Sequence, residues 1–198
     1  LYKILDAGVF PRLTTEPFPA NVNGKNMSFD RGTIVIPVSQ RDANSTLTED
    51  DIHNLMNDIA LENHVNIYAT NSASTPTGPD LGGAFQGLLK KPKVAILSGR
   101  GTSSYGVGEV WHLLNHRMHI PASLVDANNL SQRKLSHYNT LILADGNYTM
   151  LDSTDIQSIK DWNKEGGTLI TTGSASRWAV NKKILSLIHI SEPTRPTP

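Results

Sequence analysis

The chain has 198 residues, with 18 Lys and Arg against 18 Asp and Glu, seven histidines and no cysteine. A formal net charge of zero argues against nucleic-acid binding, and the lack of cysteine excludes disulfides, cysteine-ligated zinc and a thiolate nucleophile. The sequence has no run of about 18 apolar residues, so we expect no membrane span.

Residues 1–77 predict a small α/β segment. In chain order, we expect a helix over 1–9, a short strand over 12–18, a turn-rich loop over 19–26 and a buried strand over 31–38. A helix should follow over 45–64, because Thr48 can cap it, acidic residues fill its first turn and apolar residues form one stripe. The run Val65–Thr70 predicts a second buried strand and completes a βαβ unit.

A break in this pattern separates the segment from a second domain. Residues 71–93 carry Pro and Gly without periodicity, and we place a linker at 78–92. Over 93–184 we expect strands at 93–99, 122–127, 139–146 and 167–174, and helices at 106–118, at 152–167 and from 174 onward. Such alternation predicts an α/β fold with an open, mostly parallel, doubly wound sheet.

Polar residues gather where the predicted strands end. The carboxyl edge of an open parallel sheet is the usual ligand crevice, because the loops after the strands meet there. The candidate ligand-binding residues at this crevice are Arg100, Ser103, Ser104, Asp126, Asp145, Asn147 and Ser174. The serines are equally suited to turns and helix caps, and G-x-S-x-G, the motif of many serine hydrolases, is absent.

A glycine pair after the first of these strands is typical of dinucleotide-binding turns. Gly99-x-Gly101 follows a strand and precedes a helix, but Ser104 stands where the third glycine of G-x-G-x-x-G belongs. Asp126 ends the next strand, where an acidic residue would bind a ribose, and it keeps the hypothesis open.

Three histidines lie close together on and after the first helix of this domain. His112 and His116 are spaced i, i+4, with Glu109 one turn before them, whereas His119 falls beyond the expected helix end. The zinc motif H-E-x-x-H is absent. We therefore favour solvated histidines near a helix C-terminus, where positive charge is stabilised, and assign no metal ligand in this chain.

Several longer stretches resemble a known family. "KPKVAILSGRGTSSYGVGEVWHLLNHRMHIPASLVD", "YNTLILADGNY" and "IKDWNKEGGTLITTGSASRW" resemble the class I glutamine amidotransferase-like domain found behind the peptidase domain of bacterial zinc carboxypeptidases of the carboxypeptidase A-like superfamily. "RGTIVIPV", "EDDIHNLMNDIALENHVNIYAT" and "GPDLGG" resemble the segment that joins the two domains. The resemblance covers residues 1–184 and implies a flavodoxin- and amidotransferase-like sheet.

The resemblance implies a non-catalytic accessory region of a larger, exported zinc metallocarboxypeptidase. Gly146 and Asn147 stand where an amidotransferase has its nucleophilic cysteine, and no His-x-x-Glu zinc motif is present. The zinc and the signal peptide would then belong to the upstream part of a periplasmic or extracellular parent. The expected partners are the upstream peptidase domain and peptide substrate. The alternative is a stand-alone small-molecule or nucleotide-binding domain, or a Ser/His hydrolase, that uses the strand edge.

The end of the chain differs from the rest. "LSLIHISEPTR" (Leu185–Arg195) resembles, residue for residue, one reading frame of a transposase mosaic-end sequencing adaptor. We therefore expect residues 185–198 to be a non-native tail, and the chain to be a middle slice of a longer protein. The tail should fray or extend the last helix without specific packing, and His189 receives no role.

Overall fold

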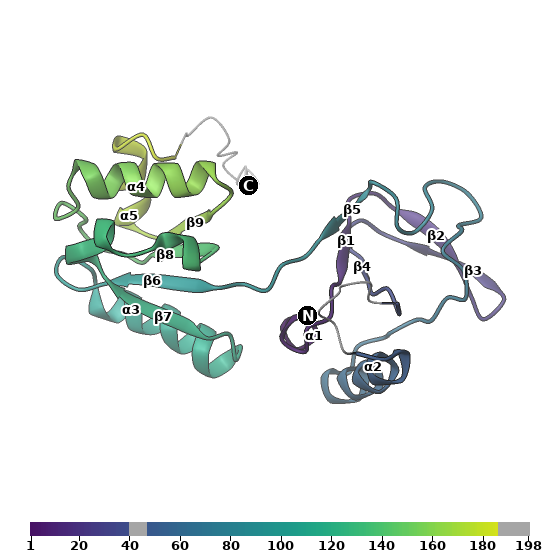
Figure 1. The fold of residues 1–198 in the computed structure, drawn as a ribbon. Coiled ribbons are helices and arrows are strands. Elements are labelled where there is room, and N and C mark those ends of the chain that lie inside the picture. Colours follow the sequence, from purple (N-terminus) through teal and green to yellow (C-terminus); the bar gives the residue numbers. More distant parts are fainter. Residues whose placement is uncertain (40–46, 186–198) are drawn as a thin grey trace, which may run out of the picture. The chain divides into compact units, whose positions relative to one another are not determined.

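A computed structural model describes residues 1–39 and 47–185. The chain divides into two compact units, Leu1–Lys91 and Pro92–Pro198 (Figure 1). No helix within the described ranges is long and apolar enough to cross a membrane.

The second unit is built on a four-stranded parallel sheet. Its strands are β6 (Val94–Ser98), β7 (Ala122–Asp126), β8 (Thr140–Leu143) and β9 (Thr168–Thr171), in the order β7-β6-β8-β9. Its helices are α3 (Ser104–Trp111), a π-helix (His112–Arg117), 3₁₀ turns (Ala127–Gln132 and Leu135–His137), α4 (Ser153–Lys164) and α5 (Ser174–Asn181). The predicted fold class, a parallel α/β sheet flanked by helices and preceded by a smaller segment, is confirmed.

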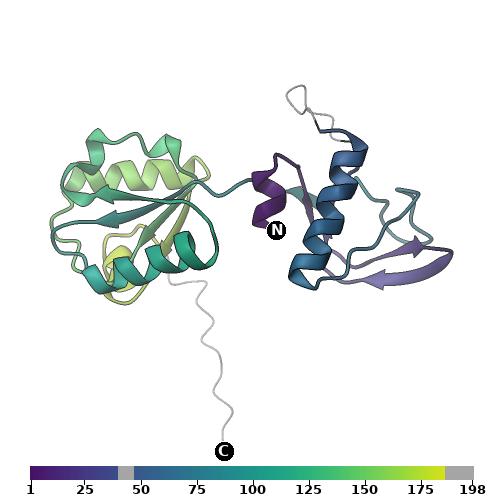
Figure 2. The same ribbon diagram turned by 90° about the horizontal axis from the view of Figure 1, so that it is seen from below.

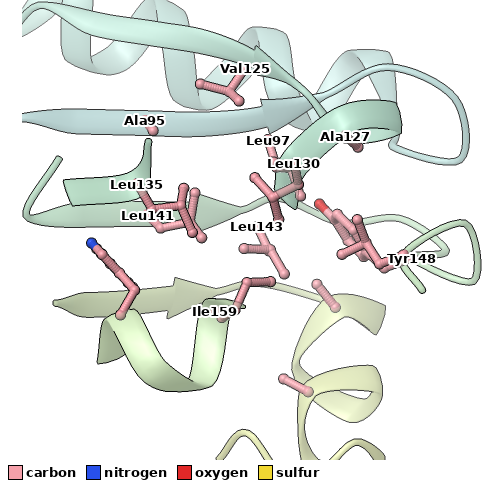
Figure 3. Packing of buried hydrophobic residues seen from close by; sticks show 14 of the residues in the cluster. Ala95, Leu97, Val125, Ala127, Leu130, Leu135, Leu141, Leu143, Tyr148 and Ile159 are labelled. Carbon is pink, nitrogen blue, oxygen red and sulfur yellow. The ribbon is translucent and has the colours of Figure 1, made fainter. Parts of the chain in front are cut away.

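Burial on both faces explains why the two central strands of this sheet, β6 and β8, are apolar runs. On one face, Ile96 and Ile142 pack with Val107 of α3. On the other, a cluster of fifteen buried residues joins the sheet to the 3₁₀ turns, α4 and α5, and Figure 3 shows Leu97, Leu141 and Leu143 pointing into it. Figures 1 and 2 both place α3 and α4 on opposite sides of the sheet.

Tyr148 anchors the loop that follows β8. Its side chain, labelled in Figure 3, is fully buried. It packs against Trp178, and its hydroxyl donates a hydrogen bond of 2.7 Å to the Ala144 carbonyl oxygen. Burial raises the pKa of Tyr148, so the phenol stays neutral and remains a donor. The backbone after β8 is thereby fixed directly beside the candidate crevice.

The described part of the first unit consists of smaller antiparallel pieces and two helices. Its elements are α1 (Tyr2–Asp6), β1 (Arg12–Thr14), β2 (Phe18–Val22), β3 (Lys25–Phe29), β4 (Ile34–Val35), α2 (Glu49–Asn63) and β5 (Gln86–Leu88). One sheet has the order β4-β1-β5, and β2 pairs with β3. Thr48 and Asp51 form the capping box of α2, as the sequence of its first turn favours.

The loop prediction for residues 19–26 is wrong. β2 and β3 form an antiparallel hairpin there, with Val22 opposite Lys25. Asn23 and Gly24 have φ values of 51° and 81°, the left-handed conformation that an Asn-Gly hairpin turn requires. The physical reason is that this short turn reverses the chain directly between two strands, which pair with each other along five residues.

The predicted βαβ unit is also wrong. Val65–Thr70 forms no strand and is exposed throughout, and β4 contains only two residues, paired antiparallel with β1. β-branched residues favour a strand only where a neighbouring strand can complete the hydrogen-bond ladder. Within the described part of the first unit, Val65–Thr70 has no such neighbour.

Part of the predicted linker at 78–92 is structured. β5 lies inside it and pairs with β1, from Arg12 opposite Leu88 to Thr14 opposite Gln86. Phe85 is buried against Phe18, with ring centroids 6.0 Å apart. Phe85 therefore belongs to the core of the first unit, and residues 86–88 belong to its three-stranded sheet.

Only the first residue of the expected tail lies among the described residues. Leu185 packs against the large cluster of the second unit, and its amide donates to the Ala179 carbonyl oxygen at 3.4 Å. The expectation that the tail lacks specific packing is therefore wrong at Leu185. Residues 186–198 lie outside the described residues, so the expectation stays a prediction for them.

Candidate functional site

The seven predicted site residues all follow the carboxyl ends of the parallel strands. Arg100, Ser103 and Ser104 come after β6, Asp126 ends β7, Asp145 and Asn147 come after β8, and Ser174 begins α5 after β9. All seven residues therefore lie at the carboxyl edge of the sheet. Its detailed contacts decide how many of these groups can meet a ligand.

The loops after β6 and β8 close on each other between their strands. The Ser103 amide donates to the Asp145 carbonyl oxygen at 2.8 Å, and the Asn147 amide donates to the Gly101 carbonyl oxygen at 2.7 Å. A Cβ on Gly146 would lie 2.8 Å from the Gly101 carbonyl oxygen, and one on Gly101 would clash with the Asn147 carbonyl oxygen. Backbone thus fills the space between β6 and β8, where an open sheet of this order usually binds its ligand.

Asp145 and Ser174 tie the ends of β8 and β9 together. Asp145 Oδ1 accepts hydrogen bonds from the Ser174 hydroxyl at 2.6 Å and the Ser174 amide at 2.8 Å. The hydroxyl bond, followed by the amide bond, holds the pKa of Asp145 below its usual value. Gly173, with φ of 57°, is needed because a Cβ there would clash with the Asp145 carboxylate.

This arrangement does not activate Ser174 as a nucleophile. The hydroxyl oxygen also lies 2.8 Å from the Gly146 carbonyl oxygen and accepts from the Gly146 amide at 3.1 Å. Its described hydrogen-bond partners include no histidine that could take its proton. The pair is a cross-link between loops.

The Asp126 carboxylate is also used in hydrogen bonds within the fold. Its Oδ1 accepts from the Asn128 amide at 2.9 Å and from Asn128 Nδ2 at 2.8 Å, and so caps the 3₁₀ turn after β7. A Cβ on Gly99 would lie 2.8 Å from the same oxygen. Gly99 is therefore explained by the close approach of Asp126, without a bound pyrophosphate.

The remaining predicted residues separate into two kinds. The Ser103 hydroxyl accepts from the Gly106 amide at 3.2 Å and caps α3, and Asn147 Oδ1 accepts from the Thr149 amide at 3.1 Å. Arg100 and Ser104 are exposed, and their side chains form no hydrogen bond or ion pair with any described residue. These two side chains are therefore available to a partner or ligand.

A shallow pocket of about 340 Å³ lies beside Ser104, between α3 and β7. Trp111 and Leu124 supply apolar walls, and Gly108 opens it because nothing lies within 4 Å of the position that its Cβ would take. Sequence reasoning missed Trp111 and Leu124. The available signal was Gly108. Glycine inside a helix lowers the stability of the helix, so a glycine in an amphipathic helix can mark a position where an open surface is useful.

The three histidines do not converge on one site. The rings of His112 and His116 stack with centroids 5.2 Å apart, while His119 lies beyond the π-helix with φ of 54°. Among the described residues, no group of three or more His, Cys, Asp or Glu is placed to hold a metal ion.

Comparison with known proteins adds no relative: no family model, curated protein or solved structure matches the chain.

Proposed function

We propose that the chain is a non-catalytic accessory region of a larger zinc metallocarboxypeptidase and that its second unit packs on the peptidase domain. The parentage rests on the sequence resemblance. The observation that carries the non-catalytic assignment is the closed strand edge. The Asp145 carboxylate joins the loops after β8 and β9, while the Asp126 carboxylate and the Ser103 hydroxyl cap the turn and the helix that follow them.

The turn after β8 supports this proposal most directly. An amidotransferase needs a side-chain nucleophile there, whereas Gly146 is in backbone contact with Gly101 and Thr102. A side chain at this position would displace the loop after β6. The turn is thus built for close backbone packing.

Exposed apolar side chains on the second unit support a packing role. Two lie on strands: Leu124 in β7 and Ile170 in β9 are 53% and 43% exposed. Their register partners in the sheet, Ile96 and Ile142, are buried beneath α3. Leu124 and Ile170 therefore flank the covered part of one sheet face, and a partner domain could bury them. The parent would be exported, with its zinc in the peptidase domain, and the accessory region could also contact peptide substrate.

Co-purification tests the packing role. The peptidase domain encoded upstream is expressed as a separate chain, and the present chain should co-purify with it. Ile170→Asp should reduce the yield of the complex by at least about tenfold, because it would bury an unpaired charge. Leu61→Asp is the matched control: Leu61 is 74% exposed on α2 of the first unit and should have no effect. Failure of the unaltered chain to co-purify would refute the packing role.

Small-molecule binding is the second candidate, favoured by the pocket beside Ser104. Gly108→Leu should extend a side chain into this pocket, since nothing lies within 4 Å of the position of the new Cβ. A ligand that raises the melting temperature of the unaltered chain but not of this variant would support a binding function. A ligand that stabilises both equally would place its site elsewhere.

A further inference from the structure

A pair of histidines lies on a rare type of helix in the second unit. The chain passes from α3 directly into the π-helix His112–Arg117, where the Met118 amide donates to the Leu113 carbonyl oxygen at 2.9 Å. This i→i+5 bond widens the turn. Short π-helical segments within helices are uncommon and frequently accompany functional sites.

The two imidazoles lie face to face. His112 and His116 are spaced i, i+4, their ring centroids are 5.2 Å apart and their planes differ by 28°. Trp111 meets His116 edge-on, with ring centroids 5.0 Å apart, and so limits where that ring can turn. The spacing and the neighbouring indole bring two nitrogen ligands to the same face of one helix.

Neither histidine is used by the fold. Both side chains are exposed, and neither ring forms a hydrogen bond with any described residue. The apolar side of this segment is carried by Leu114 and Trp111, which pack toward the sheet. The ring nitrogens are therefore open to an incoming ion.

We propose that His112 and His116 chelate one divalent transition-metal ion, with water completing its coordination. Two histidines at i, i+4 on a helix face are a proven zinc-ligand spacing, and neutral imidazole suits Zn²⁺, Ni²⁺ and Cu²⁺. Cu²⁺ should bind most tightly and Ni²⁺ more weakly, following the general order of affinity for nitrogen ligands. A two-ligand site leaves open positions on the metal, unlike a closed structural zinc site. This site is independent of the proposed accessory function.

Titration of the untagged chain with Cu²⁺ and Ni²⁺ tests the proposal, with calorimetry and tryptophan fluorescence as readouts. The chain should bind one ion at the pair. His116→Gln or His112→Gln should each raise Kd at least about tenfold, because the second imidazole binds intramolecularly once the first is attached. His119→Asn is the matched control, since His119 is a neighbour outside the pair and Asn tolerates its positive φ.

Fluorescence locates the ion. Bound Cu²⁺ should quench Trp111, which touches His116, and Trp111→Phe should remove most of the quenching while one ion still binds. Circular dichroism checks that the variants fold, as expected for the exposed histidines and for Trp111→Phe, which keeps an aromatic ring against the sheet. The proposal is overturned if the double variant His112→Gln/His116→Gln binds as tightly as the unaltered chain. It is equally overturned if His119→Asn weakens binding as much as either pair variant does.

Discussion

Two apolar runs of similar composition, one in each unit, differ completely in burial. Val94–Leu97 of the second unit is buried on both faces, whereas Val65–Tyr68 of the first unit is exposed along its whole length. β6 has β7 on one side and β8 on the other, so its backbone is satisfied by two ladders. Residues 65–68 belong to no ladder among the described residues.

The cores of the two units differ in the same way. Among the described residues, the second unit has one cluster of fifteen buried residues and another of five across its sheet. The first has separate clusters of five and three, around Ile52 and around Phe18. An apolar run becomes a core strand only where other elements supply both a ladder and a covering face. The second unit supplies both within one continuous stretch of chain.

The largest expected effect compares the two runs directly. Ile96→Ala should lower the free energy of unfolding by about 2–5 kcal/mol, because it leaves a cavity in a closely packed core. Ile67→Ala should change it by no more than about 0.5 kcal/mol, as at other surface positions. Ile96 is 0% exposed and Ile67 is 41% exposed. Urea unfolding followed by circular dichroism measures both.

Tryptophan fluorescence sharpens this measurement. Trp111, Trp162 and Trp178, the three tryptophans of the chain, all lie in the second unit, so fluorescence reports on Ile96→Ala where it acts. The contrast between the two runs would be contradicted if Ile67→Ala lowered the free energy of unfolding as much as Ile96→Ala does. That result would mean that Val65–Thr70 is part of a packed strand in solution.

The parallel sheet was predictable because each of its crossovers is local in sequence. Each strand of the second unit is followed by its helix or turn and then by the next strand. The hydrophobic periodicity alone therefore predicts the succession of strands and helices along the chain. The three-stranded sheet of the first unit is different. It pairs Arg12 with Leu88, and a local pattern carries no information on partners so distant. The Asn23-Gly24 hairpin was within reach of sequence reasoning, because its turn signal is local.

The sequence predicts where the candidate site residues lie, but not whether their side chains are free to bind a ligand. Strand ends locate Asp145, Ser174 and Asp126 at one edge, since parallel strands all point the same way. Whether a carboxylate there is free depends on contacts between different loops, such as Asp145 with Ser174. The glycines have a local explanation as well: Gly99 and Gly101 fit a phosphate loop in sequence, and the close approach of Asp126 and of Asn147 already favours glycine at these two positions.

Two glycines of the second unit give a smaller test of the closed edge. Gly146→Ala should destabilise the chain by about 1–3 kcal/mol, the usual cost of overpacking, because the new Cβ would lie 2.8 Å from Thr102 Cα. Gly108→Ala should stabilise it by about 0.5–1 kcal/mol, since the position is helical and open. Thermal unfolding followed by tryptophan fluorescence measures both. Equal effects would show that the loops after β6 and β8 are not in contact.

The smallest expected effect compares one carboxylate from each unit. The pKa of Asp51 is lowered by the Thr48 amide first and the Thr48 hydroxyl second, whereas that of Asp145 is lowered by the Ser174 hydroxyl first and the amide second. Ser174→Ala should therefore raise the pKa of Asp145 more than Thr48→Ala raises that of Asp51. Carboxyl ¹³C chemical shifts, titrated by NMR, measure both pKa values.

The same hydrogen bonds determine how the stability of the fold changes with pH. Because each pKa is lower in the folded chain than in the unfolded one, ionisation of Asp145 stabilises the fold above the unfolded value of about 3.9. This stabilisation is lost as the pH falls through the lower native pKa. Ser174→Ala should reduce the stability that the chain loses on acidification. Thr48→Ala should reduce it less, because the Thr48 amide still donates to Asp51 at 2.9 Å. An Asp145 pKa that Ser174→Ala leaves unchanged would show that Asp145 does not hold the ends of β8 and β9 together.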